Sequence, residues 1–269
     1  MHTGKSFEGA LSTWIKLRQL NTKPNTQKFY GFVRAVMLRH WPDPAQLVES
    51  VTLDEALDFA QRVAHYSPSY WNGIVAALHF LVPEARVIKF RAMRMKDRPL
   101  LSQAEFTRLL EECDKLPRSR AGLVVNFLAH TGLRINEARQ LRWSDVGADC
   151  VTVPGSLTKN GKPRVIPFIN GIREVLARLR AVTGERPFVL PGASVRKGLH
   201  RACRRAGVPA LGHHDFRHLF ATRCITSGVD LPTVARWLGH RDGGALLART
   251  YFHLVDEHSR TMAAKVVVV

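Results

Sequence analysis

Helical periodicity, marked off by capping residues and prolines, constrains the fold of this chain more than any other feature. Thr52 and Glu55 form a capping box ahead of LDEALDFAQRVAHY, and Ser102 and Glu105 form a second one ahead of AEFTRLLEECDKL. Pro68 opens a further helical segment, SYWNGIVAALHFLV. Because capping residues and prolines delimit several helical segments, the chain is expected to be mainly α-helical.

One segment breaks the helical pattern and predicts a small β component. In CVTVPGSLTKNGKPRVIPF, residues 150–168, alternating valines flank Asn160-Gly161, which is a strong hairpin signal. Lys159 and Lys162 bracket the expected turn, where a lysine can either reach a phosphate or simply protect an exposed sheet edge. The expected fold class is therefore mainly α with a small β component, in which a helical domain precedes an α+β domain.

Charge is distributed unevenly along the 269 residues, which carry a net charge of +18. Residues 1–90 hold 10 Lys and Arg against 7 Asp and Glu, and residues 91–269 hold 30 against 15. We expect a helical domain over 1–90, an exposed basic linker over 91–99 and a second domain over 100–269. Such a basic chain favours a polyanionic partner, and nucleic acid is the leading candidate.

Several classes of protein are disfavoured by what the sequence lacks. The four cysteines have neither metal-ligand spacing nor the density of a disulfide framework, so we expect no metal and no cofactor. The sequence shows no signal-peptide pattern and no apolar run of membrane-spanning length. A soluble, cytoplasmic protein is the expectation.

Polar side chains of the second half supply candidate site residues. Arg134 falls at the start of a helix, where a cation opposes the helix dipole, and Glu137 can hold its guanidinium from three residues on. His214, Arg217 and His218 share one face of another predicted helix. Each could equally be an ordinary surface or core residue. An arginine amid the histidines argues against a metal site.

Five segments in order resemble the tyrosine recombinase (phage integrase) family over roughly residues 100–260. They are HTGLRINEARQL, TKNGKPRVIPF, HHDFRHLFAT, WLGH and RTYFHL, and the last contains Tyr251, the one tyrosine in the second half of the chain. Any one short motif is weak, but five in this order are specific. The resemblance implies a helical core-binding domain ahead of a catalytic domain.

The resemblance also implies a set of catalytic residues: Arg134, Lys159, His214, Arg217, His240 and Tyr251, with Glu137 in support. Tyr251 would attack a DNA phosphodiester and form a 3′-phosphotyrosine linkage. Two arginines suit the charge that develops on the phosphate, a histidine can accept the phenolic proton, and a lysine can protonate the leaving 5′-oxygen. His213 competes with His214 for this role, and Lys162 competes with Lys159.

The implied partner is double-stranded DNA with inverted-repeat half-sites, bound by a homo-tetramer whose subunits are monomers in solution. Residues 252–269, which end in four valines, would dock on a neighbouring protomer. A type IB topoisomerase and a catalytically silent DNA-binding relative are the alternative functions. Candidate phosphate contacts in the sequence are Lys23, Lys28, Arg34, Arg39, Lys89, Arg91, Arg94, Lys96, Lys162 and Arg164.

Overall fold

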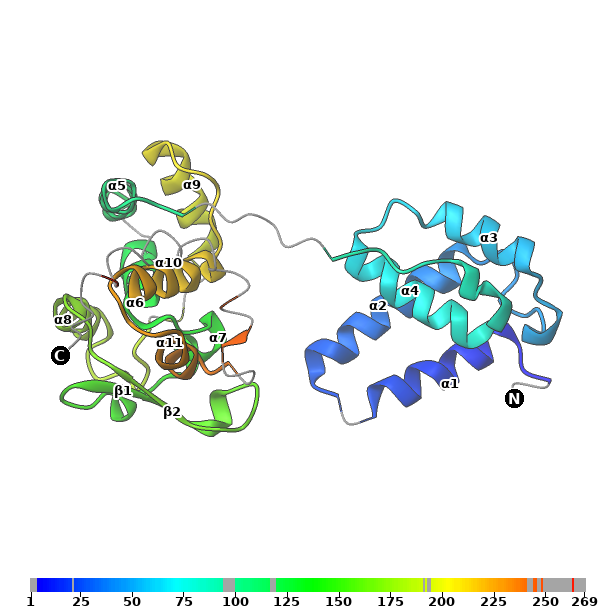
Figure 1. Cartoon of the computed structure of the whole chain (residues 1–269), viewed down its shortest axis with the longest axis horizontal. Helices are drawn as coiled ribbons and strands as arrows, with labels where there is room; N and C mark the ends of the chain where they lie inside the picture. The colour runs from blue at the N-terminus through cyan, green and yellow to red at the C-terminus, as the bar shows by residue number, and fades with distance from the viewer. Residues whose placement is uncertain are drawn as a thin grey trace. The chain divides into compact units, whose positions relative to one another are not determined.

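The chain divides into two compact units, residues 1–96 and 97–269, and each has its own hydrophobic core (Figure 1). The computed structural model describes residues 4–20, 22–93, 100–116, 120–190 and 195–240, together with residues 192, 244, 245, 248 and 263. Tyr251, Arg94, Lys96 and the predicted docking tail, apart from Ala263, lie outside the described residues.

The first unit is built from helices. The elements are α1 (Phe7–Gln19), α2 (Pro24–His40), α3 (Leu53–Arg62) and α4 (Pro68–Leu81), with 3₁₀ turns η1 (Val48–Ser50) and η2 (Pro83–Val87). Helix α1 packs against α2 and α4, and Phe7 stacks on Trp41 with ring centroids 4.0 Å apart. The predicted capping box is confirmed, because Glu55 N–H donates to Thr52 Oγ1 and Thr52 N–H donates to Glu55 Oε2.

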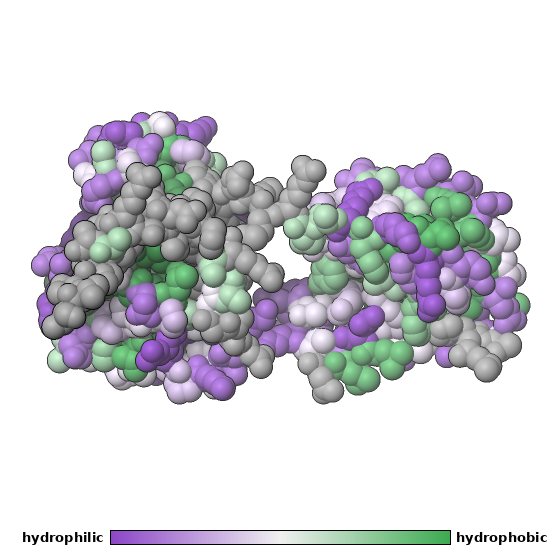
Figure 2. Space-filling view, viewed as in Figure 1, coloured by the Kyte–Doolittle hydropathy of each residue, from purple (hydrophilic) through white to green (hydrophobic). Residues whose placement is uncertain are grey.

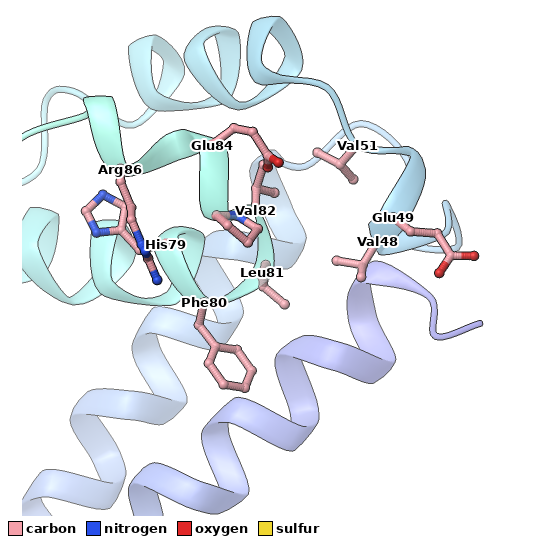
Figure 3. A pocket seen from close by; sticks show the side chains of 10 residues that line it. Val48, Glu49, Val51, His79, Phe80, Leu81, Val82, Glu84 and Arg86 are labelled. Carbon is pink, nitrogen blue, oxygen red and sulfur yellow. The ribbon is translucent and has the colours of Figure 1, made fainter. Parts of the chain in front are cut away.

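A groove of about 550 Å³ opens on this unit between η1 and the end of α4. Figure 3 shows His79 and Arg86 together at one end of the groove and Val48 and Glu49 at the other. Its lining mixes apolar side chains with charges of both signs.

The second unit combines helices with one small sheet. Its elements are α5 (Gln103–Asp114), α6 (Ala121–Thr131), α7 (Ile135–Gln140), η3 (Trp143–Asp145), β1 (Cys150–Val153), η4 (Gly155–Leu157), β2 (Arg164–Pro167), α8 (Ile172–Thr183), α9 (Arg196–Ala206), α10 (His213–Thr226) and α11 (Leu231–Leu238). Helix α6 is buried along most of its length and packs against α10 and α8 (Figure 1). The predicted fold class, mainly α with a small β component, is confirmed.

The antiparallel pair β1–β2 differs from the predicted tight hairpin. Val151 lies opposite Ile166 and Val153 opposite Arg164, so ten residues, 154–163, separate the strands. Gly161 has the positive φ of 75° that an Asn-Gly turn requires, but the turn lies within this connection. Pro154 and Pro163 are the first and last residues of this connection. Because proline has no N–H to donate to a strand ladder, the pairing of β1 and β2 ends before the turn.

Part of the predicted basic linker is packed on the first unit. Arg91 N–H donates to Asn72 Oδ1 at 2.7 Å, and its Nη1 donates to the carbonyls of Ala64 and Tyr66. The same guanidinium lies 3.9 Å from the centre of the Trp71 ring. Arg91 is thus engaged in structural contacts and half-buried, and its role as a phosphate contact stays a prediction.

The length and apolar character of a helix determine whether it can cross a membrane. Among the described residues, none of the helices has both the length and the apolar character needed to cross a bilayer.

Candidate active site

A sharp turn between α6 and α7 positions Arg134. Gly132 ends α6 with a left-handed φ of 61°, and a Cβ atom there would lie 2.5 Å from Phe220 and 2.7 Å from Leu238. Glycine therefore lets this turn pack closely against α10 and α11. Arg134 follows in extended conformation and caps α7, one residue before the helical turn in which the sequence predicts it.

Glu137 is buried at the centre of an ion-pair network. Its carboxylate accepts hydrogen bonds from Arg134 N–H at 3.0 Å and Arg134 Nη1 at 2.9 Å, and from Arg164 Nη2 at 2.6 Å and Nη1 at 3.3 Å. Burial by itself would raise the pKa of Glu137, but the hydrogen bonds and charge of Arg164, together with Arg134, outweigh it and lower the pKa. Glu137 is therefore ionised and held between two guanidinium groups.

Arg164, one of the phosphate contacts predicted from the sequence, is buried in the structure. Its side chain is 5% exposed, it forms the ion pair with Glu137, and its Nε donates to the carbonyl of Trp237 at 2.7 Å. Arg164 begins β2, whose side chains alternate between the core and solvent, and its position faces inward. The side chain therefore binds within the protein.

Arg217 connects the turn between α6 and α7 with the end of α11. This α10 residue is 3% exposed, and its Nη1 and Nη2 donate to the carbonyls of Gly132 at 2.8 Å and Leu238 at 2.6 Å. Gly132 lies two residues before Arg134, and Leu238 lies two residues before His240. Arg217 is thus fixed between the loop that carries Arg134 and the loop that carries His240.

His240 follows the end of α11 in a defined turn. Gly239 has a left-handed φ of 68°, and His240 N–H donates to the carbonyl of Ala235 at 2.9 Å. A Cβ atom at Gly239 would lie 3.1 Å from Cδ of Arg164, so this turn also contacts the buried arginine. His240 itself is half-buried.

The two neighbouring histidines at the start of α10 have different surroundings. His213 is half-buried, and burial, followed by the charges of Arg139, Arg196 and His200, lowers its pKa. His214 is exposed, and its ring packs edge-on against His218 with centroids 5.0 Å apart. Spacing does not separate the two, because Arg217 lies four residues after His213 and three residues after His214, and both spacings place a histidine on its face of the helix. The greater exposure of His214 favours it as the histidine that meets a bound substrate.

The candidate lysines lie on the connection between β1 and β2. Lys159 and Lys162 are both exposed, and Lys162 N–H donates to Asn160 Oδ1 at 3.2 Å, which closes a local turn. Exposure therefore does not discriminate between the two lysines.

Most basic candidates of the first unit lie on its surface. Arg34 forms an ion pair with Glu8 at 2.6 Å, and both side chains remain substantially exposed. The other candidates that are described and exposed are Lys23, Lys28, Arg39 and Lys89.

Helix α9 carries a basic surface that the sequence analysis did not single out. Its buried face is formed by Leu199, Ala202, Cys203 and Ala206, and it packs against α5. The exposed basic residues are Arg196, Lys197, Arg201, Arg204 and Arg205. Figure 2 shows a largely hydrophilic surface around α5 and α9. The amphipathic spacing of RKGLHRACRRA could have revealed this face.

Comparison with known proteins places this geometry in a family. The model of the phage integrase family matches residues 99–258. Tyrosine recombinase XerA of Saccharolobus solfataricus is 27% identical over 172 residues, which are 62% of this chain and 56% of that protein. The chain thus spans little more than half the length of this relative.

Two solved structures share the fold at low sequence identity. The Tn1549 transposon integrase in complex with transposon right end DNA has a TM-score of 0.74 and 17% identity, and the similarity covers 98% of this chain and 100% of that one. A lambda integrase tetramer bound to a Holliday junction has a TM-score of 0.68 and 20% identity, with 88% and 77% covered. Because the family model matches well over half of the 269 residues, the chain belongs to the phage integrase family of tyrosine recombinases.

Proposed function

We propose that this protein is a site-specific DNA recombinase that cleaves and rejoins DNA strands through a covalent link to Tyr251. The convergence of Arg134, Arg217 and the His240 turn supports this proposal most directly. These residues come from three separate segments, and two guanidinium groups fixed by buried contacts suit the binding of a phosphate whose charge increases during reaction.

The proposed cleavage step is an in-line exchange at phosphorus. The Tyr251 oxygen attacks, its proton passes to His214, and the bond from phosphorus to the 5′-oxygen breaks. Lys159 gives a proton to that oxygen, while Arg134 and Arg217 stabilise the phosphate and His240 donates a hydrogen bond to it. The product is a 3′-phosphotyrosine and a free 5′-hydroxyl, so attack by another 5′-hydroxyl reverses the step without ATP.

DNA is the proposed partner, and four copies of the chain would bind two duplexes that each carry two inverted half-sites. The net charge of +18 and the basic face of α9 favour a phosphate backbone. One solved structure of similar fold is a tetramer on a Holliday junction, which is the junction that two strand exchanges would pass through here.

Substitution of the nucleophile tests the proposed function. We expect Tyr251→Phe to bind DNA as the unmodified protein does but to form no covalent complex, because only the hydroxyl is lost. A nicked suicide substrate followed by a denaturing gel measures the complex. Equal trapping of the Phe variant would exclude Tyr251 as the nucleophile.

Products formed by the unmodified protein separate the alternatives. Recombinant products between two duplexes support a recombinase, and relaxation of supercoils without strand exchange would indicate a topoisomerase. DNA binding with no covalent complex would indicate a DNA-binding protein.

A further inference from the structure

Arg164 occupies a position that links three parts of the candidate active site. It lies on β2, forms two hydrogen bonds to Glu137 at the start of α7, and donates Nε to Trp237 at the end of α11. Glu137 in turn binds Arg134, and Trp237 lies three residues before His240. The sequence separations are 27 residues to Glu137 and 73 to Trp237. One buried side chain thus joins segments that are distant in sequence.

The three side chains of this network differ in their exposed fractions. They are 5% for Arg164, 2% for Glu137 and 33% for Arg134. Two members are therefore enclosed by protein, and the third reaches the surface. A rigid internal pair can hold an exposed guanidinium in one orientation, which a solvated ion pair of two long side chains does not do.

A gain in stability alone does not explain why the Arg164–Glu137 ion pair is buried. Removing two charges from water is costly, and apolar residues of similar volume often stabilise a core equally well. The planar guanidinium nevertheless provides what the network requires, because Nη1 and Nη2 meet the carboxylate while Nε meets the Trp237 carbonyl. The planar arrangement of its three donor nitrogens is thus what distinguishes arginine from other residues at position 164.

We propose that Arg164 is a positioning residue that orients Arg134 through Glu137 and holds the His240 turn against the same anchor. Without Arg164, two of the four hydrogen bonds to Glu137 that involve the arginines are lost, and the carboxylate can rotate away from Arg134. The consequence for cleavage rests on the proposed function, whereas the orientation of Arg134 does not.

Arg164→Lys and Arg164→Met test the proposal, with Arg223→Met as the matched control. Arg223 is a partly buried arginine of α10 that lies over the Phe106 ring, 4.5 Å from its centre, outside the network. We expect both Arg164 variants to lower the rate constant of covalent complex formation on saturating DNA about 100-fold, with half-site affinity nearly unchanged. The control is expected to lower the melting temperature and to cleave at the normal rate.

A double substitution distinguishes positioning from a general structural effect. If Arg164 acts through Arg134, its replacement adds little further loss in a chain that already carries Arg134→Ala. Losses that multiply in the double variant would overturn the proposal, and so would normal cleavage by Arg164→Lys.

A measurement without DNA tests the orientation by itself. Nitrogen-detected NMR of the arginine guanidinium groups, with the Arg134 signal assigned by Arg134→Lys, reports rotation about its Cζ–Nε bond. We expect restricted rotation in the unmodified protein and in Arg223→Met, and faster rotation in Arg164→Lys. An unchanged Arg134 signal in Arg164→Lys would overturn the proposal, even if the protein cleaved no DNA and the proposed function had failed.

Discussion

At the scale of single residues, Glu137 shows how charge can be kept in a protein interior. Burial opposes its ionised form, and the paired arginines more than compensate, so its pKa lies below the ordinary value of 4.5. A lowered carboxylate pKa stabilises the folded state above the unfolded pKa, and this contribution is lost as the pH falls through the folded-state value.

Glu137→Gln should therefore destabilise the second unit in a pH-dependent way. The substitution leaves Arg164 buried without its counter-charge, and we expect a loss of about 3–5 kcal/mol in the free energy of unfolding at pH 7. The difference from the unmodified protein should shrink as the pH falls below about 4.5. Hydrogen exchange of amides in α6 and α10 measures it.

The exposed pair between Arg178 and Asp114 supplies the control for this prediction. Both side chains are about half exposed, so Asp114→Asn should change stability little at either pH. A difference for Glu137→Gln that stayed constant down to acid pH would contradict the assigned role of its carboxylate.

At the scale of elements, α8 and α9 both carry several basic residues but use them differently. On α8, Arg173 lies over Phe168, Arg178 pairs with Asp114 and Arg180 lies over Trp143. On α9, Arg205 pairs with Glu112 at 2.6 Å, whereas Lys197, Arg201 and Arg204 line a groove of about 480 Å³ together with His200 and Ala210. The α9 surface is therefore the better candidate for a phosphate backbone.

Replacing Arg196, Lys197 and Arg201 together by Gln should weaken DNA binding and its dependence on salt. Each lost phosphate contact is expected to reduce the slope of log affinity against log salt by about 0.9. Gel-shift titrations at several salt concentrations measure the slope. The control replaces Arg173, Arg178 and Arg180 on α8 by Gln, which removes the same charge. Equal reductions by both variants would indicate a general charge effect without an α9 contact.

At the scale of the whole molecule, two separate cores imply that each unit can be ordered without the other. The charge is concentrated in residues 91–269, with 30 basic against 15 acidic residues. We propose that binding to a single half-site rests chiefly on the basic surfaces, and that assembly of several protomers rests on a separate apolar element. The C-terminal segment with Val266–Val269 is our candidate for that element.

Deletion of residues 258–269 should separate binding from assembly. We expect a truncated protein to bind one half-site nearly as well as the full chain, because the basic surfaces remain. Cooperative filling of the second half-site and recombination between two duplexes should both decrease. Gel-shift titration on single and paired half-sites, with a recombination assay, measures these effects. A truncated chain that fills and recombines paired sites normally would exclude the tail as a protomer-linking element.

Features that depend on near neighbours in the chain could be predicted from the amino-acid sequence. Both capping boxes form as predicted, with Ser102 N–H donating to Glu105 Oε2 and Glu105 N–H donating to Ser102 Oγ. The start of α4 at Pro68 and the end of α6 at Gly132 are likewise local consequences of fixed φ and of left-handed backbone. The ordered motifs identified the family because they also are read directly along the chain.

Which basic side chains are enclosed and which face solvent could not be predicted, because it depends on the tertiary structure. Arg164 and Arg91 look like surface charges in the sequence, yet one pairs with Glu137 and the other packs on Trp71. Conversely, the basic face of α9 was not predicted from the sequence. The reason is physical: the environment of a charge depends on segments that fold against it, and the partners of Arg164 lie 27 and 73 residues away.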